Sequence, residues 1–296
     1  MSLNSKIQLA SIDYMITSTC NLNCEFCDRF SNFNLSWFEK VEQFEEDLDN
    51  LLKTVSFKSF DLMGGEPLLH PKLTDMLKIS RKYMLNTFIG TFSNGFLIKD
   101  TNLIETLVDI QPSSLQISIH FKDKEQQQII YSNIKEFILK PFSYEIIDKN
   151  NILVDKNVII HIKDQTKHTW NNFYQIIDGK FKPFFDNDPI NSYKTCGHSA
   201  LLAFKGRLFK CPPISQLRPM AEKYGFLEDP DWEQYLKYTG LSFNASKEDY
   251  LEFFEKQWKP DPTLCTMCPS SPDKSEKQKI VSHKSNYYKR LLAPSS

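Results

Sequence analysis

Apolar, β-branched runs alternate with helical patterns along the first 190 residues, and each run stops at glycines or polar residues. Such bounded runs are typical of buried strands. They cover residues 12–19, 59–63, 86–92, 114–120, 157–162 and 181–185. Strands that alternate with helices form parallel sheets with right-handed crossovers, so their carboxyl ends share one face. The expected fold class is α/β, a partial (β/α)6 barrel of the TIM type with its site on that face.

Helices are expected between these strands. A capping-box pattern, Ser36 with Glu39, precedes apolar residues at helical spacing up to Val55. The other helices are expected near residues 71–83, 101–109, 122–139 and 168–177, and residues 141–155 fit neither pattern. After about residue 190 the alternation gives way to a hairpin at 200–212, which turns at Lys205-Gly206, and to two helices near 230–238 and 246–258. We therefore expect two domains, residues 1–190 and 191–296.

Composition narrows the class of protein. The 296 residues carry a net charge of -1 and no long basic run, which argues against nucleic acid as a partner. No apolar run reaches a membrane-spanning length and the N-terminus lacks a signal-peptide core, so we expect a cytoplasmic protein without membrane contact. In the cytosol thiols stay reduced, which favours metal ligands or catalytic groups over disulfides for the seven cysteines.

Three of these cysteines, Cys20, Cys24 and Cys27, lie within eight residues directly after the first expected strand. Thiolates bind the irons of an iron–sulfur cluster, and a cubane has four irons. Three ligands leave one coordination position open, as catalytic metal sites require. A zinc site completed by a distant fourth ligand is the alternative.

The pattern C-x-x-x-C-x-φ-C, in which φ is Phe26, resembles that of the radical S-adenosylmethionine (SAM) superfamily. The resemblance implies a [4Fe–4S] cluster on the three cysteines, with SAM chelating the open iron. It also implies a flavodoxin- or ferredoxin-type electron donor, whose electron drives SAM cleavage to a 5′-deoxyadenosyl radical. In this family the protein positions the cofactor, and the cofactor carries out the difficult chemistry.

Further motifs at the ends of successive strands match the same family. Gly64, Gly65 and Glu66 resemble the GGE turn that binds the methionine amino group, and glycines there allow a close backbone approach. Ser93 and Asn94 resemble the segment that contacts the ribose, and Ser118 resembles a serine on the fourth strand that contacts the cofactor. Phe26 resembles the position whose backbone reads the adenine. His120 departs from the family, where aspartate is common.

The remaining cysteines, Cys196, Cys211, Cys265 and Cys268, form a tetrad. Four thiolates close a tetrahedral zinc site or ligate a second cubane completely. A hairpin flanked by cysteines and followed by C-x-x-C is similar to the twitch or SPASM auxiliary-cluster extension of the family. The resemblance therefore implies a small C-terminal domain of a β-hairpin plus helices with an auxiliary [4Fe–4S] cluster. This plan is similar to that of the aminocyclitol dehydrogenases with one auxiliary cluster.

The resemblance implies an oxidoreductase-type enzyme. Only 19 residues precede Cys20, too few for a leader-binding domain, so we expect a small polar substrate such as a sugar, an aminocyclitol or a nucleotide derivative. The reaction expected is hydrogen abstraction, as in a dehydrogenation with the auxiliary cluster as electron acceptor. One alternative is modification of a ribosomally made peptide with a separate leader-binding partner, and another is a zinc-binding module without catalysis.

Two histidines are candidate catalytic residues. His120 follows the fourth expected strand and His161 lies on the fifth. Imidazole changes its charge near neutral pH and serves as a base or an acid. A hydrogen-bonded histidine within the core of the barrel is the alternative for both.

Overall fold

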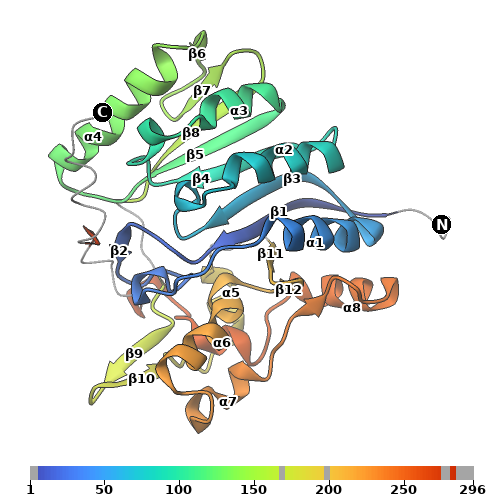
Figure 1. The fold of residues 1–296 in the computed structure, drawn as a ribbon. Coiled ribbons are helices and arrows are strands. Elements are labelled where there is room, and N and C mark those ends of the chain that lie inside the picture. The colour runs from blue at the N-terminus through green and yellow to red at the C-terminus, as the bar shows by residue number, and fades with distance from the viewer. Residues whose placement is uncertain (1–5, 167–170, 197–200, 275–280, 285–296) are drawn as a thin grey trace. The chain divides into compact units, whose positions relative to one another are not determined.

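The computed structural model describes residues 6–166, 171–196, 201–274 and 281–284 (Figure 1). The chain divides into two compact units. The first contains residues 1–23, 36–167 and 281–296, and the second contains residues 24–35 and 168–280. The described part of the chain has no helix that is long and apolar enough to cross a membrane.

A parallel sheet forms the centre of the first unit. Its strands lie in the order β1 (Ile7–Thr17), β3 (Val55–Gly64), β4 (Phe88–Ser93), β5 (Ser113–Ile119) and β8 (Val158–Asp164). The hairpin of β7 (Asn151–Val154) and β6 (Tyr144–Ile146) continues the sheet antiparallel beyond β8. The fold class predicted from the sequence is confirmed, because five of the six expected strands form this parallel sheet.

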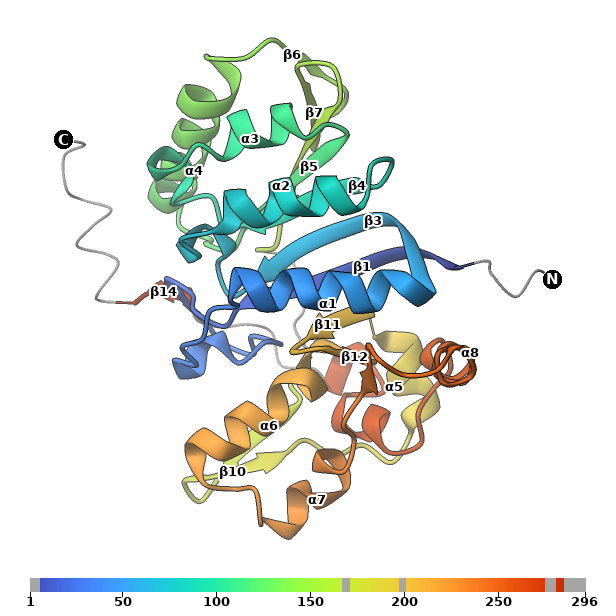
Figure 2. The same ribbon diagram turned by 45° about the vertical axis from the view of Figure 1, so that its right-hand side comes forward.

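Helices line one face of this sheet (Figure 2). They are α1 (Val41–Thr54), α2 (Leu73–Tyr83), α3 (Leu103–Asp109) and α4 (Lys124–Ile134), with a π-helical turn at Lys135–Leu139. Short 3-10 turns lie at Ser31–Phe33, Pro67–Leu69 and Ile98–Asp100. The Tyr14 ring packs 5.0 Å from the Phe44 ring of α1, so alternate strand residues pack on the helices. The strand residues that alternate with these helix-facing ones point to the opposite face of the sheet. Several of them are polar, among them Asp13 of β1, Asp61 of β3 and Gln116 of β5.

Some local expectations were wrong. Ser36 and Glu39 do not cap α1, because the Glu39 amide donates to Ile16 O and the helix begins only at Val41. The segment expected as a sixth parallel strand is β10 (Lys180–Pro183), which pairs antiparallel with β9 (Tyr174–Ile177). The helix expected at 168–177 is therefore partly β9, and its first residues lie outside the described ranges.

The second unit contains the hairpin of β11 (Leu201–Phe204) and β12 (Arg207–Phe209), as expected, with β13 (Leu241–Ser242) paired to β12. Its helices are α5 (Pro189–Thr195), α6 (Pro212–Tyr224), α7 (Pro230–Leu236) and α8 (Lys247–Gln257), with 3-10 turns at Leu264–Met267 and Pro272–Lys274. Aromatic rings pack against one another in this unit. The buried ones belong to Phe26, Phe30, Phe173, Tyr174, Phe226 and Trp232, and the half-buried rings of Phe33 and Phe181 pack at their edge.

Candidate active site

The two glycines at the end of β3 allow its backbone to run against the end of β1. The Gly65 amide donates to Thr17 O and the Glu66 amide donates to Thr19 O, each over 2.9 Å. A Cβ at Gly64 would lie 2.2 Å from Thr17 O, and one at Gly65 would lie 2.4 Å from Thr19 O. Both distances are far below van der Waals contact, so only glycine fits at these positions. The backbone just before the first cysteine is thereby fixed against this turn.

The Glu66 side chain joins this turn to the one after β4. It is 1% exposed, its Oε1 accepts from the Leu68 amide (3.1 Å) and its Oε2 accepts from the Asn94 amide (2.7 Å). Burial raises the pKa of this carboxyl to about 7, although the bonds from Asn94, Leu68 and Ser93 oppose the rise. The glutamate of the first turn therefore fixes the backbone of the second.

Asn94 extends this connection to the cysteine loop. Its Nδ2 donates to Asn21 Oδ1 over 2.7 Å, and its Oδ1 accepts from the Phe96 amide over 3.3 Å. The carbonyl of Asn21 in turn accepts from the Lys284 amide (2.8 Å), beside the pairing of β14 (Val281–His283) with β2 (Leu22–Cys24). Asn21 was missed by the sequence analysis, because nothing in the local pattern distinguishes it from the other polar residues of the loop.

Ser93 and Ser118 occupy the strand ends where the sequence placed them. Ser93 is the last residue of β4, and its Oγ accepts from the Gly95 amide over 3.0 Å. Ser118 lies on β5 and accepts from Gln116 Nε2 over 3.2 Å. His120 follows β5 and is half-buried. The first unit thus brings Cys20, the glycine turn, Ser93 and Asn94 into one hydrogen-bonded region, with Ser118 and His120 at the end of the strand beside β4.

The second half of the cysteine loop belongs to the second unit, since the boundary lies between Asn23 and Cys24. Phe26 and Phe30 have positive φ values of 56° and 51°, which bulky residues adopt only under constraint. Packing supplies the constraint, because the Phe26 ring lies 5.7 Å from that of Tyr174 and the fully buried Phe30 ring lies 5.1 Å from that of Phe173. Burial also raises the pKa of Cys27.

The second unit also brings the four remaining cysteines close together. Cys196 follows α5, Cys211 precedes α6, Cys265 lies in the 3-10 turn Leu264–Met267 and Cys268 ends that turn. Desolvation, together with the charges of Cys196 and Cys265, raises the pKa of Cys211 to about 12. The pKa of Cys268 is raised well above its ordinary value by desolvation and then by its three partners. These raised pKa values keep the thiols protonated at neutral pH, so binding of a metal at them would release their protons.

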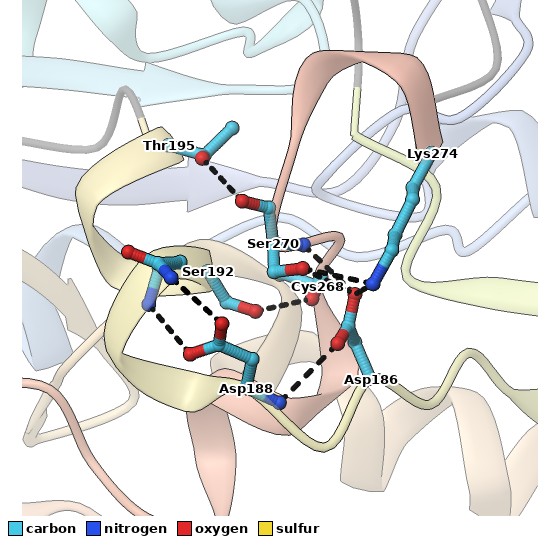
Figure 3. A network of polar contacts seen from close by, with 8 residues as sticks. Asp186, Asp188, Ser192, Thr195, Cys268, Ser270 and Lys274 are labelled. Atoms are coloured by element: carbon cyan, nitrogen blue, oxygen red, sulfur yellow. Dashed lines mark hydrogen bonds and ion pairs between the residues drawn. The ribbon is translucent and has the colours of Figure 1, made fainter.

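Asp186 connects the segment after Cys268 to the segment before Cys196 (Figure 3). Its Oδ2 accepts from the Ser270 amide (3.0 Å), from Ser270 Oγ (2.8 Å) and from Lys274 Nζ (2.7 Å). Ser192 of α5 donates to Cys268 O over 2.7 Å. Two segments about 75 residues apart in the chain are thus joined around the tetrad.

The seven cysteines fall into two groups, three in the loop after β1 and the tetrad of Cys196, Cys211, Cys265 and Cys268. None of the seven forms a disulfide, and all lie in described residues. Within the described ranges, no group of three or more cysteine, histidine or carboxylate side chains is placed so that it could hold a metal ion. Thiolates are the usual protein ligands of iron–sulfur clusters, so the three cysteines of the loop suit such a cluster by their chemistry.

Comparison with protein families matches residues 14–169 to the model of the radical SAM superfamily. The chain belongs to the radical SAM superfamily. Membership implies SAM and a [4Fe–4S] cluster as cofactors, and members of the family are enzymes that use a reductant. The match includes the end of β1 from residue 14, the cysteine loop, both turns described above and β8.

Individual curated relatives share less than a third of their aligned residues with this chain. The chain is 29% identical over 152 residues to the 7-carboxy-7-deazaguanine synthase of Methanothermobacter thermautotrophicus, and the aligned segment is 49% of this chain and 56% of that protein. It is 26% identical over 152 residues to an S-adenosylmethionine-dependent nucleotide dehydratase of Lacinutrix mariniflava, 49% of this chain and 31% of that protein. The chain thus spans a third to about half of these curated relatives. A crystal structure of BtrN with AdoMet and 2-DOIA covers 89% of this chain and 94% of its own, at 12% identity and a TM-score of 0.48.

Proposed function

We propose that this chain is a radical SAM oxidoreductase acting on a small polar molecule. In this proposal Cys20, Cys24 and Cys27 hold the [4Fe–4S] cluster. The SAM contacts come from Phe26, Gly64, Gly65, Glu66, Ser93, Asn94 and Ser118. The bound cofactors supply a 5′-deoxyadenosyl radical that abstracts hydrogen from the substrate.

The connection from Asn21 through Asn94 to Glu66 is the observation that carries this proposal. These bonds, 2.7 Å each, join the cysteine loop to the two turns that the family uses for SAM. A protein that bound only zinc through its cysteines would have no need to connect those turns to the loop. The side chains of Glu66 and Asn94 are both used in these bonds, so their part in the proposal is to orient the backbone of the turns.

For the net reaction we propose the two-electron oxidation of a secondary alcohol, with an auxiliary [4Fe–4S] cluster as electron acceptor. In this proposal the barrel domain is residues 1–190 and the auxiliary domain is residues 191–296, with Cys196, Cys211, Cys265 and Cys268 as its ligands, whereas the compact units place residues 24–35 and 168–280 together. The mutual electrostatic influence of these four thiols supports a common site. The name of one curated relative, a nucleotide dehydratase, favours a nucleotide derivative among the substrates, beside sugars and aminocyclitols.

Release of 5′-deoxyadenosine tests the class. Anaerobically reconstituted protein with SAM and a chemical reductant should release it, and Cys20→Ala, Cys24→Ala and Cys27→Ala should each abolish the release. Cleavage that persists in all three variants contradicts the proposal.

Iron and sulfide analysis tests the second site. Two cubanes give about eight irons per chain. About four irons with one zinc would exclude the auxiliary cluster as electron acceptor, and zinc without iron would favour the non-catalytic alternative. Turnover of a ribosomal peptide in place of small alcohols would favour the peptide-modifying alternative.

A further inference from the structure

The face of the parallel sheet that is opposite the helices is polar near the end of β5 and β8. Ile117 on β5 and Ile130 on α4 both lie within 3.1 Å of the position where a Cβ on Gly95 would be, so Ile117 points to the helices. Its neighbour Gln116 therefore points to the other face. His161 of β8 is the direct cross-strand partner of Gln116, and both side chains are half-buried. His161 thus lies on the helix-free face, one side-chain row before Ser118.

The next strand fixes one nitrogen of this imidazole. Asn151 of β7 is the antiparallel partner of His161, and its Oδ1 lies 2.6 Å from His161 Nδ1. Asn151 Nδ2 donates to Asp148 Oδ2 over 2.8 Å. Asp148 Oδ1 accepts from the amides of Asn150 (2.7 Å) and Asn151 (3.0 Å), which holds the carboxylate in place at the tip of the hairpin.

The direction of each bond follows from the carboxylate. An ionised carboxylate only accepts, so the amide nitrogen of Asn151 must face Asp148 and the amide oxygen must face His161. An amide oxygen also only accepts, so His161 Nδ1 must carry the hydrogen. The lone pair of the neutral ring is then on Nε2, and Nε2 makes no hydrogen bond within the described part of the chain.

We propose that His161 is the base that takes the hydroxyl proton of the substrate, and that Asn151 and Asp148 are positioning residues that hold its tautomer. This inference rests on the proposed alcohol oxidation. In the step, the substrate O–H bond breaks, its electron pair stays on oxygen, and the proton forms an N–H bond at Nε2. The logic is that of other histidine bases, in which a carboxylate fixes the tautomer and stabilises the imidazolium without taking the proton.

Asp148→Asn gives a sharp test because it preserves the shape of the turn. The two backbone amides should keep the remaining oxygen of residue 148, so the new amide nitrogen faces Asn151. The Asn151 amide must then turn over, so that its nitrogen donates to His161 Nδ1 and the hydrogen of the ring moves to Nε2. Asp155→Asn is the matched control, since Asp155 is an exposed carboxylate at the other end of β7 that accepts from Gln111.

Nitrogen-15 NMR of the full chain, reconstituted and labelled at its six histidines, distinguishes the two tautomers. The resonance that disappears in His161→Gln identifies the residue. We expect the Nδ1–H form in the wild type and in Asp155→Asn, and the Nε2–H form in Asp148→Asn. A wild type in the Nε2–H form overturns the inference. So does an Asp148→Asn variant whose His161 resonance is the same as that of the wild type.

Kinetics on an accepted alcohol substrate supply a second measurement. Loss of a general base lowers turnover about 10²- to 10⁴-fold, so we expect that loss in His161→Gln and a decrease in Asp148→Asn. Turnover in His161→Gln within about twofold of the wild type overturns the inference. Failure of the wild type to release 5′-deoxyadenosine would contradict the proposed function instead, while the NMR result would still report on the tautomer.

Discussion

Ionisation of Glu66 should make the fold less stable as the pH rises. Burial raises its pKa from an ordinary 4.5 to about 7 in the folded chain. Between these values the folded chain keeps a proton that the unfolded chain has released, so the free energy of unfolding falls with rising pH. A pKa difference of this size corresponds to about 3 kcal/mol, of which about 2 to 3 kcal/mol should be lost between pH 5 and pH 8.

Glu66→Gln removes this dependence and adds a constant cost. Both carboxyl oxygens accept from backbone amides, from Leu68 and from Asn94, and an amide nitrogen cannot accept. One buried amide therefore loses its partner, at a cost of about 1 to 3 kcal/mol. At pH 5 the variant should be less stable than the wild type, and the difference should shrink, or change sign, by pH 8.

Urea denaturation of the full chain, followed by tryptophan fluorescence in the presence of a reductant, a chelator and no SAM, measures both effects. Glu105→Gln is the matched control, because Glu105 is exposed on α3 and its replacement should leave the pH dependence of the wild type intact. Stability curves that run parallel for Glu66→Gln and the wild type from pH 5 to pH 8 would refute the argument.

Three further substitutions test packing and connection. Gly65→Ala places a Cβ 2.4 Å from Thr19 O, so it should destabilise the chain by about 1 to 3 kcal/mol and lower the amount of iron bound at the cysteine loop. A variant as stable as the wild type that binds as much iron would contradict this. Asp186→Asn removes the ion pair to Lys274, and iron per chain should fall from about eight toward about four while 5′-deoxyadenosine release persists; unchanged iron would contradict it. Phe30→Ala should cost about 3 to 5 kcal/mol in urea denaturation, whereas Leu85→Ala, 71% exposed, should cost almost nothing; equal costs would refute the role of the aromatic core.

The sequence predicted what local patterns encode. The first five strands and the hairpin at Lys205-Gly206 were predictable because alternating apolar residues and turn residues determine them locally. The hairpin of β6 and β7 gave no such signal, since all three residues of β6 are exposed and its apolar residues do not face a core. β9 was mistaken for a helix for a related reason, because Ile176 and Ile177 are exposed and their order carries no clear period.

Candidate site residues were predictable where a motif places them at a strand end. Gly64, Gly65, Ser93 and Asn94 are of this kind. The residues that connect the motifs were not, because their partners are distant in the chain: Asn21 and Asn94 are 73 positions apart, and Asp186 and Ser270 are 84 apart. Contacts of such separation arise only when the fold brings the segments together, and one sequence does not contain that information.

Residues 24–35 belong to the second unit although the chain on either side belongs to the first, and this limits which fragments of the protein can fold. A fragment that ends at residue 167 would hold nearly the whole segment that matches the family, together with Phe26 and Phe30. It would lack Phe173, Tyr174 and Phe181, against which those rings pack. The loop would then present bare aromatic surface, and its left-handed residues would relax to more ordinary backbone angles. The segment that matches the superfamily is therefore not expected to fold correctly on its own. Deletion of the C-terminal half should also disturb the cysteines near the N-terminus.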